Sequence, residues 1–212
     1  KNMWTICSSV SKIAAILFPP ACLGCGKKDT ALCESCLLRA RRALDTPAPS
    51  VKSYYSFRDP LIKRAIHAIK YYHRKDLVAL LAKAVGHELS EELSSTSAPW
   101  IFVPIPMPRL RKYLRGYNQA ELIAKELSYI CNIPMRTDIL FRKKASKRQV
   151  RSHTKHERLH NQKGSFFVSE SAQDLLIILV DDVATTGATL TEAKAALLRA
   201  GAKAVRAVTL AH

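Results

Sequence analysis

Apolar residues recur along the chain at two different spacings, and these spacings predict an alternation of helices and strands. Spacings of three and four residues predict helices that begin near residues 60, 77, 118 and 189. Short apolar runs predict strands at 101–103, 166–168, 175–180 and 205–211. A buried strand followed by a loop, a helix and a returning strand is typical of a parallel sheet. The expected fold class is therefore α/β.

A stretch with two prolines and small polar residues, 45–50, interrupts this pattern. Because such a composition disfavours both a helix and a central strand, the stretch is interpreted as a linker. We therefore expect two domains. Residues 1–46 form the first, with an apolar segment ahead of a cysteine-rich part, and residues 47–212 form the second, which holds the parallel-sheet core.

The apolar runs are too short for a membrane protein. The longest, at 13–18 and 175–180, fall far below the ~18 residues that a bilayer-spanning helix requires. Pro19 and Pro20 follow the first run in place of a small-residue cleavage site, which argues against a secretory signal. We expect no membrane span and a cytoplasmic location.

Positive charge is strong and unevenly distributed. The chain has 34 Lys and Arg against 17 Asp and Glu, a formal net charge of +17 in 212 residues. Most of the excess lies at 39–83 and 136–163, whereas the part after residue 163 is nearly neutral. Two basic segments indicate a localised positive face suited to nucleic acid or phosphorylated ligands, with a merely solubilising surface as the alternative.

Four of the six cysteines follow the spacing of a metal site, Cys22-x2-Cys25-x7-Cys33-x2-Cys36. Each Cys-x2-Cys pair turns two thiolates toward one metal, and two such pairs complete a tetrahedral set of four sulfurs. Disulfides are the alternative, but a cytoplasmic location disfavours them. We expect structural Zn²⁺ on these four residues, with Cys7 and Cys131 outside the set.

The most informative stretch of the chain is 177–189, where an apolar run ends in Asp181 and Asp182. Adjacent carboxylates do not fit inside a strand that is buried on both faces, so they are expected at its carboxyl end, where ligands of open α/β sheets bind. The loop that follows is small and rich in hydroxyls, and Gly187 allows close approach of a phosphate. Acids beside a phosphate cradle predict a sugar-phosphate ligand with Mg²⁺; an acidic surface turn is the alternative.

This stretch resembles the phosphoribosyl-pyrophosphate signature of type I phosphoribosyltransferases. Together with the four cysteines and the segments 103–106, 115–120 and 158–166, it makes the chain similar to the ComF family of competence proteins along nearly its whole length. The resemblance implies a zinc-finger domain joined to a phosphoribosyltransferase-like domain that binds phosphoribosyl pyrophosphate with Mg²⁺. It also implies a role in natural transformation through internalised single-stranded DNA, and a ComFA-like helicase as partner.

The resemblance assigns site residues by matching motifs. Asp181 and Asp182 correspond to the candidate catalytic pair that addresses the ribose hydroxyls and Mg²⁺. The residues that correspond to the 5′-phosphate loop are Ala184, Thr185, Thr186, Gly187, Ala188 and Thr189. Those that correspond to the pyrophosphate side are Pro104, Ile105, Arg109, Arg115 and Asn118. Segment 148–161 corresponds to a lid; there the chain departs from the family pattern at Thr154 and keeps Arg158, which completes the set.

Two functions remain open from the sequence. The first is a DNA-processing protein that uses the phosphoribosyl-pyrophosphate fold as a ligand site. The second is an active phosphoribosyltransferase in nucleotide salvage. Tyrosines interleaved with basic residues favour stacking on the bases of a single strand, with core packing as the alternative; they are Tyr54, Tyr55, Tyr71 and Tyr72.

Overall fold

The structure is a computed structural model that describes residues 20–46, 48, 50–94, 98–143, 164–169 and 172–212. It divides into two compact units, Lys1–Ala40 and Arg41–His212. The first unit ends before the boundary at residue 46 that the prolines suggest, because the chain after Ala40 already pairs with the second unit. The Ala43 amide donates to Tyr54 O at 3.1 Å, and the Ser56 amide donates to Arg41 O at 2.8 Å.

The described part of the first unit is a turn followed by one short helix. The turn closes with a hydrogen bond from the Gly26 amide to Cys22 O at 2.9 Å. Helix α2 (Glu34–Leu38) begins directly after Cys33, and Cys36 is its one buried residue. Two cysteines thus lie on the turn side and two lie at the start of a helix.

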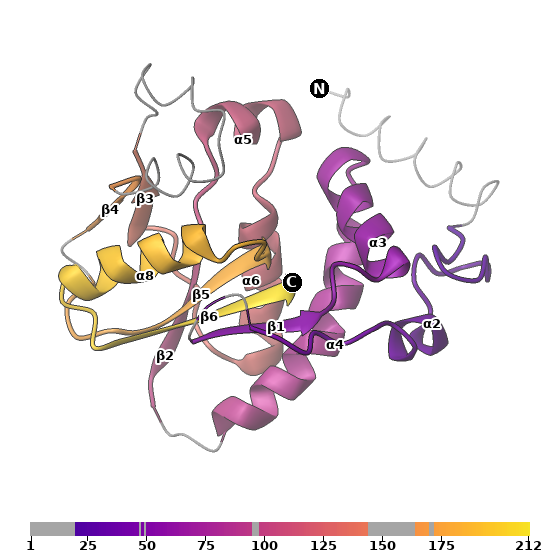
Figure 1. Ribbon diagram of the computed structural model, residues 1–212, viewed down its shortest axis with the longest axis horizontal. Coiled ribbons are helices and arrows are strands. Elements are labelled where there is room, and N and C mark those ends of the chain that lie inside the picture. The colour runs from indigo at the N-terminus through magenta and orange to yellow at the C-terminus, as the bar shows by residue number, and fades with distance from the viewer. Residues whose placement is uncertain (1–19, 47, 49, 95–97, 144–163, 170–171) are drawn as a thin grey trace, which may run out of the picture. The chain divides into compact units, whose positions relative to one another are not determined.

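The second unit is built on a parallel sheet of four strands, in the order β1-β6-β5-β2 (Figure 1). The strands are β1 (Val51–Tyr55), β2 (Trp100–Pro104), β5 (Leu176–Val183) and β6 (Ala204–Ala211). Leu179 in β5 faces Val103 in β2 and Ala207 in β6 across the ladders. Because all four strands are parallel, their carboxyl ends meet at one edge of the sheet.

Helices cover both faces of this sheet. Figure 1 shows α8 (Ala188–Arg199) across the near face and α6 (Gln119–Cys131) behind the strands. Helix α4 (Lys75–Ser94) packs against α6, and α3 (Pro60–Tyr71) packs against α4. The α4 and α6 backbones approach closely at Gly86, where an added Cβ would lie 2.9 Å from Cγ2 of Ile130.

Three smaller elements lie outside the sheet. Helix α5 (Arg109–Arg115) follows β2 and has no buried residue. Strands β3 (Leu140–Arg142) and β4 (Phe166–Val168) form an antiparallel pair, in which the rings of Phe141 and Phe167 stack at 4.8 Å. Within the described ranges, no helix combines the length and the apolar composition that crossing a membrane requires.

Most elements agree with the sequence pattern, and the α/β class with a parallel sheet is confirmed. The elements that were not expected are the strands β1 and β3 and the short helices α2 and α5. The tyrosines divide between two roles: Tyr54 and Tyr55 in β1 are 1% and 3% exposed and belong to the core, so the stacking interpretation is wrong for them. Tyr71 and Tyr72 are 61% and 68% exposed and remain accessible.

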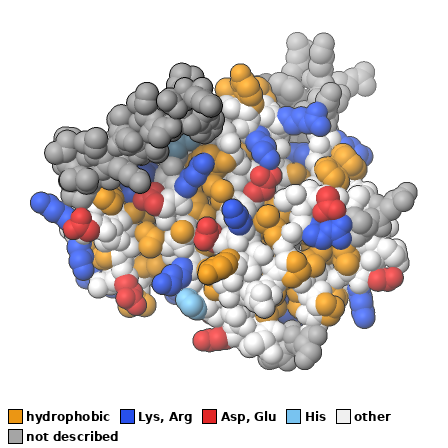
Figure 2. All heavy atoms as spheres, turned by 180° about the vertical axis from the view of Figure 1, so that it is seen from behind, with side chains coloured by type: hydrophobic (Ala, Val, Ile, Leu, Met, Phe, Trp, Pro, Cys, Tyr) orange, Lys and Arg blue, Asp and Glu red, His pale blue; other side chains and the backbone are white. Residues whose placement is uncertain are grey.

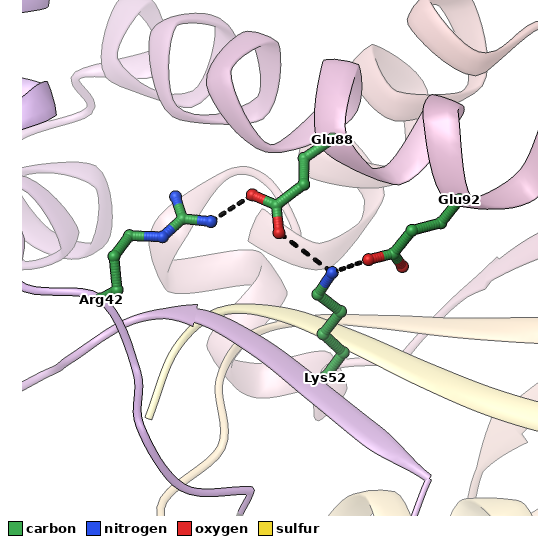
Figure 3. A network of polar contacts seen from close by, with 4 residues as sticks. All are labelled: Arg42, Lys52, Glu88 and Glu92. Atoms are coloured by element: carbon green, nitrogen blue, oxygen red, sulfur yellow. Dashed lines mark hydrogen bonds and ion pairs between the residues drawn. The ribbon is translucent and has the colours of Figure 1, made fainter.

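A network of charged side chains joins β1 to α4 on the surface of the second unit (Figure 3). Glu88 pairs with both Arg42 and Lys52, and Lys52 also pairs with Glu92. The pKa of Glu88 is lowered, because the hydrogen bonds from Lys52 and Arg42 outweigh the effect of burial. The network therefore favours the ionised carboxylate at neutral pH.

Candidate functional site

The two adjacent carboxylates lie at the carboxyl end of β5, as the sequence predicts. The Asp182 carboxylate is buried and pairs with Lys70 through Nζ and Oδ2 at 3.0 Å. Asp181 accepts a hydrogen bond from the Asp182 amide at 2.9 Å. Burial and the neighbouring Asp182 charge raise the pKa of Asp181 to about 7. The pair is therefore only partly compensated by Lys70, and an added cation would favour its fully ionised form.

The hydroxyl-rich loop lies directly after these carboxylates and opens α8. Gly187 adopts a left-handed conformation with φ 70°, which a side chain with a Cβ disfavours. Helix α8 begins at Ala188, its N-cap residue Gly187 has no side chain to cap it, and its first turn holds no acidic residue. The Ala188 amide donates to Thr186 Oγ1 at 3.4 Å. Backbone amides at the start of such a helix favour an anion.

Asn118 connects the loop after β2 to helix α6. Its side chain is 3% exposed, donates to Ile105 O at 2.9 Å and accepts from the Ala120 amide at 3.2 Å. Both ends of the amide thus have protein partners. Asn118 holds the 105–108 loop against the start of α6 and so positions that loop at the carboxyl edge of the sheet.

These segments enclose a cleft of about 750 Å³. Its walls bring together residues from α3, the 105–108 loop, α5, the start of α6, β3, the end of β5 and the start of α8. Six of the predicted site residues line it: Ile105, Arg115, Asn118, Asp181, Asp182 and Thr189. Segments far apart in the sequence therefore converge at one site.

Four cationic side chains line the cleft together with the two carboxylates: Lys70, Arg111, Arg115 and Arg142. Only Arg115 among them was predicted. Burial and the nearby Arg111 lower the pKa of Arg142, although Asp181 acts in the opposite direction. A cleft that is lined by both cationic and acidic side chains suits a ligand that carries both anionic groups and hydroxyls.

Gln119 is a further residue that sequence reasoning missed. It lines the cleft, its side chain is 2% exposed, and its Nε2 is buried with no hydrogen-bond partner among the described atoms. A buried donor without a partner is costly in a folded protein, so its presence at a cleft indicates a place for a ligand acceptor or water. Its position next to Asn118 was the available signal.

The remaining predicted residues lie elsewhere. Ala184 and Thr185 line a second, neighbouring cavity of about 650 Å³. The residues that do not line the cleft wall in the structure are Pro104, Arg109, Thr186, Gly187 and Ala188. Arg158, with the predicted lid 148–161, lies outside the described residues.

The four cysteines of the first unit form one cluster, whose sulfurs all lie within 4.8 Å of one another. The Cys33 sulfur is 3.6 Å from that of Cys22 and 3.7 Å from that of Cys25. Bonded sulfurs would be about 2 Å apart, so these are not disulfides. In a tetrahedral site with Zn–S bonds of about 2.3 Å the sulfurs are about 3.8 Å apart, so the cluster has the geometry of a metal site.

The electrostatics of the cluster also fit a cation. Burial opposes ionisation of Cys22, but amide donors that include Cys33 N at 3.3 Å and Gly24 N at 3.4 Å outweigh it and lower the pKa to about 6. Interaction with Cys33, together with burial, raises the pKa of Cys36 to about 12. Without a metal, repulsion between neighbouring sulfurs opposes ionisation of all four cysteines. A divalent cation would offset this repulsion and favour four thiolates.

Exposed aromatic side chains stand at the end of α3 beside the cleft. The guanidinium of Arg115 lies 5.6 Å from the Tyr71 ring centroid, and His67 contacts the rings of both Tyr71 and Tyr72. On the face drawn in Figure 2, Lys and Arg side chains are mixed with Asp, Glu and apolar side chains and do not form a single positive patch. Aromatic and cationic groups thus meet beside the cleft.

Comparison with known proteins identifies relatives of this chain. Residues 115–212 match the phosphoribosyl transferase domain family. The chain is 30% identical to competence protein ComFC of Bacillus subtilis, over 89% of this chain and 76% of that protein. It is 29% identical to the DNA utilization protein YhgH of Salmonella typhi, over 96% of this chain and 88% of that protein. Competence protein F of Haemophilus influenzae is 31% identical, over 72% of this chain and 66% of that protein.

Proposed function

The chain belongs to the ComF family and has a type I phosphoribosyltransferase-like core, and from this premise we propose that it binds phosphoribosyl pyrophosphate with Mg²⁺ and handles single-stranded DNA during DNA uptake. The observation that carries the proposal is the cleft. Asp181 and Asp182 share it with the 105–108 loop and with a set of cationic side chains. A sugar that carries phosphate at one end and pyrophosphate at the other needs this combination of groups.

Each part of the ligand has a counterpart in the site. The carboxylates of Asp181 and Asp182 accept hydrogen bonds from the ribose hydroxyls. The 5′-phosphate lies at the start of α8, where the backbone amides of a first turn without acidic residues favour it. The pyrophosphate is neutralised by Arg111, Arg115 and Arg142, because one guanidinium group can donate two hydrogen bonds to phosphate oxygens at once.

Magnesium fits the same donor set, because carboxylate oxygens and phosphates are its preferred ligands. When bound, it neutralises charge on the pyrophosphate. Lys70 compensates Asp182 in the structure, at 3.0 Å, and is in reach of the site as a second cation. The raised pKa of Asp181 means that binding of cations near pH 7 releases a proton from this carboxyl group.

Calorimetric titration with phosphoribosyl pyrophosphate, with and without Mg²⁺, tests the ligand assignment. Gly187→Val should block binding because the left-handed backbone and the close approach of the phosphate both exclude a branched side chain. Asp182→Asn should weaken mainly the Mg²⁺-dependent part. The matched control is Asp174→Asn, an exposed carboxylate outside the cleft. Wild-type affinity in both Gly187→Val and Asp182→Asn would exclude this site.

A second candidate function, transfer of the phosphoribosyl group to a base in nucleotide salvage, is favoured by the domain match over 115–212. In such a transfer the carboxylates and Mg²⁺ would stabilise positive charge that develops on the sugar. Pyrophosphate release in the presence of the common bases distinguishes the two functions. Release that depends on both a base and Asp182 supports the transferase; binding without release supports a ligand site in a DNA-processing protein.

For the cysteine cluster we propose structural Zn²⁺. Four sulfur ligands fill a tetrahedral shell and leave no position for a reacting water, so the metal stabilises the fold and takes no part in chemistry. One zinc per chain by elemental analysis is the expected result.

For single-stranded DNA the proposal rests on the two basic segments and on the exposed Tyr71 and Tyr72. If about four to six phosphates are neutralised, log K should fall against log salt with a slope of roughly −3 to −4. Reversing four basic residues to Glu should flatten that slope without changing the zinc content; they are Lys143, Lys144, Lys147 and Arg148. No single-strand affinity in low salt would remove the DNA role and favour the salvage enzyme.

The family resemblance extends the proposal to place and partner. We propose that the protein acts in the cytoplasm with a ComFA-like helicase, which would deliver the strand. Co-purification of the two proteins with and without a single strand tests this part, and a complex is expected only when the strand is present.

A further inference from the structure

A second cavity, of about 650 Å³, opens at the same edge of the sheet as the cleft. Its walls come from the chain on either side of β1 (41–45 and 56–58), from 183–185 at the end of β5 and from His212 after β6. The cleft instead uses the ends of β5 and β2. Thr185 lines this cavity and not the cleft. The two cavities therefore share the edge of one sheet and differ in their walls.

The charge of the second cavity is positive. Among the described residues that line it are three arginines and one acidic side chain, that of Asp45. Arg42 is already committed, since it pairs with Glu88 and its guanidinium lies 5.0 Å from the Tyr55 ring centroid. Over the part of the chain that the structure describes, the side chains of Arg41 and Arg58 have neither an ion pair nor a hydrogen bond. Two guanidinium groups are thus available to an anion, of which that of Arg41 also lies in the field of the Asp59 carboxylate.

The floor of the cavity is fixed by hydrogen bonds. The His212 amide donates to Tyr55 O at 2.9 Å, and the Phe57 amide donates to His212 O at 2.7 Å. The His212 ring places Nδ1 2.7 Å from Ala184 O, and because a carbonyl only accepts, Nδ1 carries the proton. These bonds tie β1, β6 and the start of the phosphate loop together, so the cavity exists before any ligand binds.

The cavity also has an apolar wall. Phe57 is half-buried, and it lines the cavity together with Ala43 and Val183. An aromatic ring next to free guanidinium groups matches the chemistry of a nucleotide, since the ring stacks on a base and the guanidinium groups bind the phosphate. A bare phosphate would leave the apolar wall unused, and an apolar molecule would leave the arginines unused.

We propose that this second cavity binds one nucleotide of a single strand, with its phosphate on Arg41 and Arg58 and its base against Phe57. The inference rests on the proposed single-strand function and gives it a specific subsite. It also places a strand nucleotide next to Thr185, which belongs to the loop proposed for the 5′-phosphate of the sugar ligand. The strand and the sugar phosphate then occupy neighbouring cavities of one sheet edge.

Anisotropy of a fluorescein-labelled oligothymidine tests the subsite across a range of salt concentrations. Arg58→Ala should weaken binding about fivefold in low salt and reduce the magnitude of the salt slope by about 0.7, the value for one phosphate contact. Phe57→Ala should weaken binding about tenfold and retain that loss in high salt, because stacking is not screened. Arg58 is exposed, so its substitution does not endanger folding. The matched control is Arg199→Ala, an exposed arginine at the end of α8, outside both cavities and outside the two basic segments.

The outcomes separate this inference from the function on which it rests. If the wild type binds the strand and both cavity variants bind equally well, the subsite is wrong and the single-strand function stands. If the wild type binds no strand, both fail together. Thymidine monophosphate is added as a competitor of the oligothymidine. If it binds as tightly as the oligothymidine does, the cavity is a site for free nucleotides and the strand assignment is wrong. Arg58→Ala should bind phosphoribosyl pyrophosphate with unchanged affinity. If its affinity for phosphoribosyl pyrophosphate falls as much as its affinity for the strand, the two cavities act as one site and the separate subsite is wrong.

Discussion

The two units of this protein differ in what holds them together. In the described part of the first unit, the buried residues are three of the four cysteines with Ala31, Leu32 and Ala40, so Leu32 is its one large aliphatic core residue there. The second unit buries large side chains on both faces of its sheet, including Phe102, Ile123 and Ile178. We therefore expect the first unit to depend on a bound metal, whereas the second unit is stabilised by its own core.

The largest expected effect comes from the cysteine cluster. Cys33→Ser should release the metal and unfold residues 20–40, because a structural Zn²⁺ site supplies about 10–16 kcal/mol of apparent binding free energy at neutral pH. Metal content and hydrogen-exchange protection of these residues measure the two losses. Cys131→Ser is the control, since its sulfur lies outside the cluster and bonds Gly86 O at 3.6 Å. If Cys33→Ser keeps one metal per chain and the same hydrogen-exchange protection of residues 20–40, the first unit does not depend on the metal.

The next effect tests the core of the second unit. Leu81 on α4 is 0% exposed, and Leu81→Ala should lower the free energy of unfolding by about 3 kcal/mol through lost burial and a residual cavity. Denaturant unfolding measures this change, and metal content should stay constant. The same substitution at Leu110, which is 70% exposed, should be nearly neutral. Equal costs at the two positions would show that the core is not the source of stability.

The sequence predicted the parts of the fold that rest on local patterns. The apolar run before Asp181 and the loop that follows it determine the order strand, loop, helix, and the pairs of cysteines determine the cluster. Strand β1 was missed because Val51–Tyr55 includes Lys52 and Ser53 among its residues and its tyrosines resemble a surface pattern. Only packing shows that those rings are buried.

The residues of the cleft that were missed share one cause. Lys70 lies in the last turn of α3 and Arg142 ends β3, and neither belongs to a motif that marks it in the sequence. Each reaches Asp181 or Asp182 only because helices and strands far apart in the chain pack around the same edge of the sheet. Similarly, the second cavity joins residues near 41, 57, 184 and 212, and no local pattern predicts such a meeting.

Burial of Asp181 next to the Asp182 charge lowers the free energy of unfolding of the second unit, and this effect depends on pH. The folded pKa of Asp181, about 7, lies above its unfolded value, so its contribution to stability is fully present below about pH 4. It is lost as the pH rises through 7. In the absence of Mg²⁺, Asp181→Asn should therefore raise the free energy of unfolding at pH 8, by on the order of 1–2 kcal/mol.

Urea unfolding at several pH values measures this difference. The gain of Asp181→Asn over the wild type should shrink steadily between pH 7 and pH 4 and vanish below it, on the scale set by the ordinary pKa of Asp, about 4. Asp174→Asn, at an exposed position, should show no such trend. A gain that grows toward low pH would have the wrong sign and would contradict the repulsion between the two carboxylates.

The smallest effect concerns the surface network of the second unit and tests whether charge contributes much beside the core. Glu88 pairs with Arg42 and Lys52, and the paired side chains are between 36% and 47% exposed (Figure 3). Exposed pairs contribute little, so Glu88→Gln should cost only about 0.5 kcal/mol. The cost should shrink further in high salt, because salt screens exposed charges. Since the folded pKa of Glu88 is lowered, this contribution is present at neutral pH and is lost as the pH falls through that pKa. Glu91→Gln, an exposed neighbour on α4, is the control; a cost at Glu88 close to that of Leu81→Ala would place the stability of this unit in its ion pairs and not in its core.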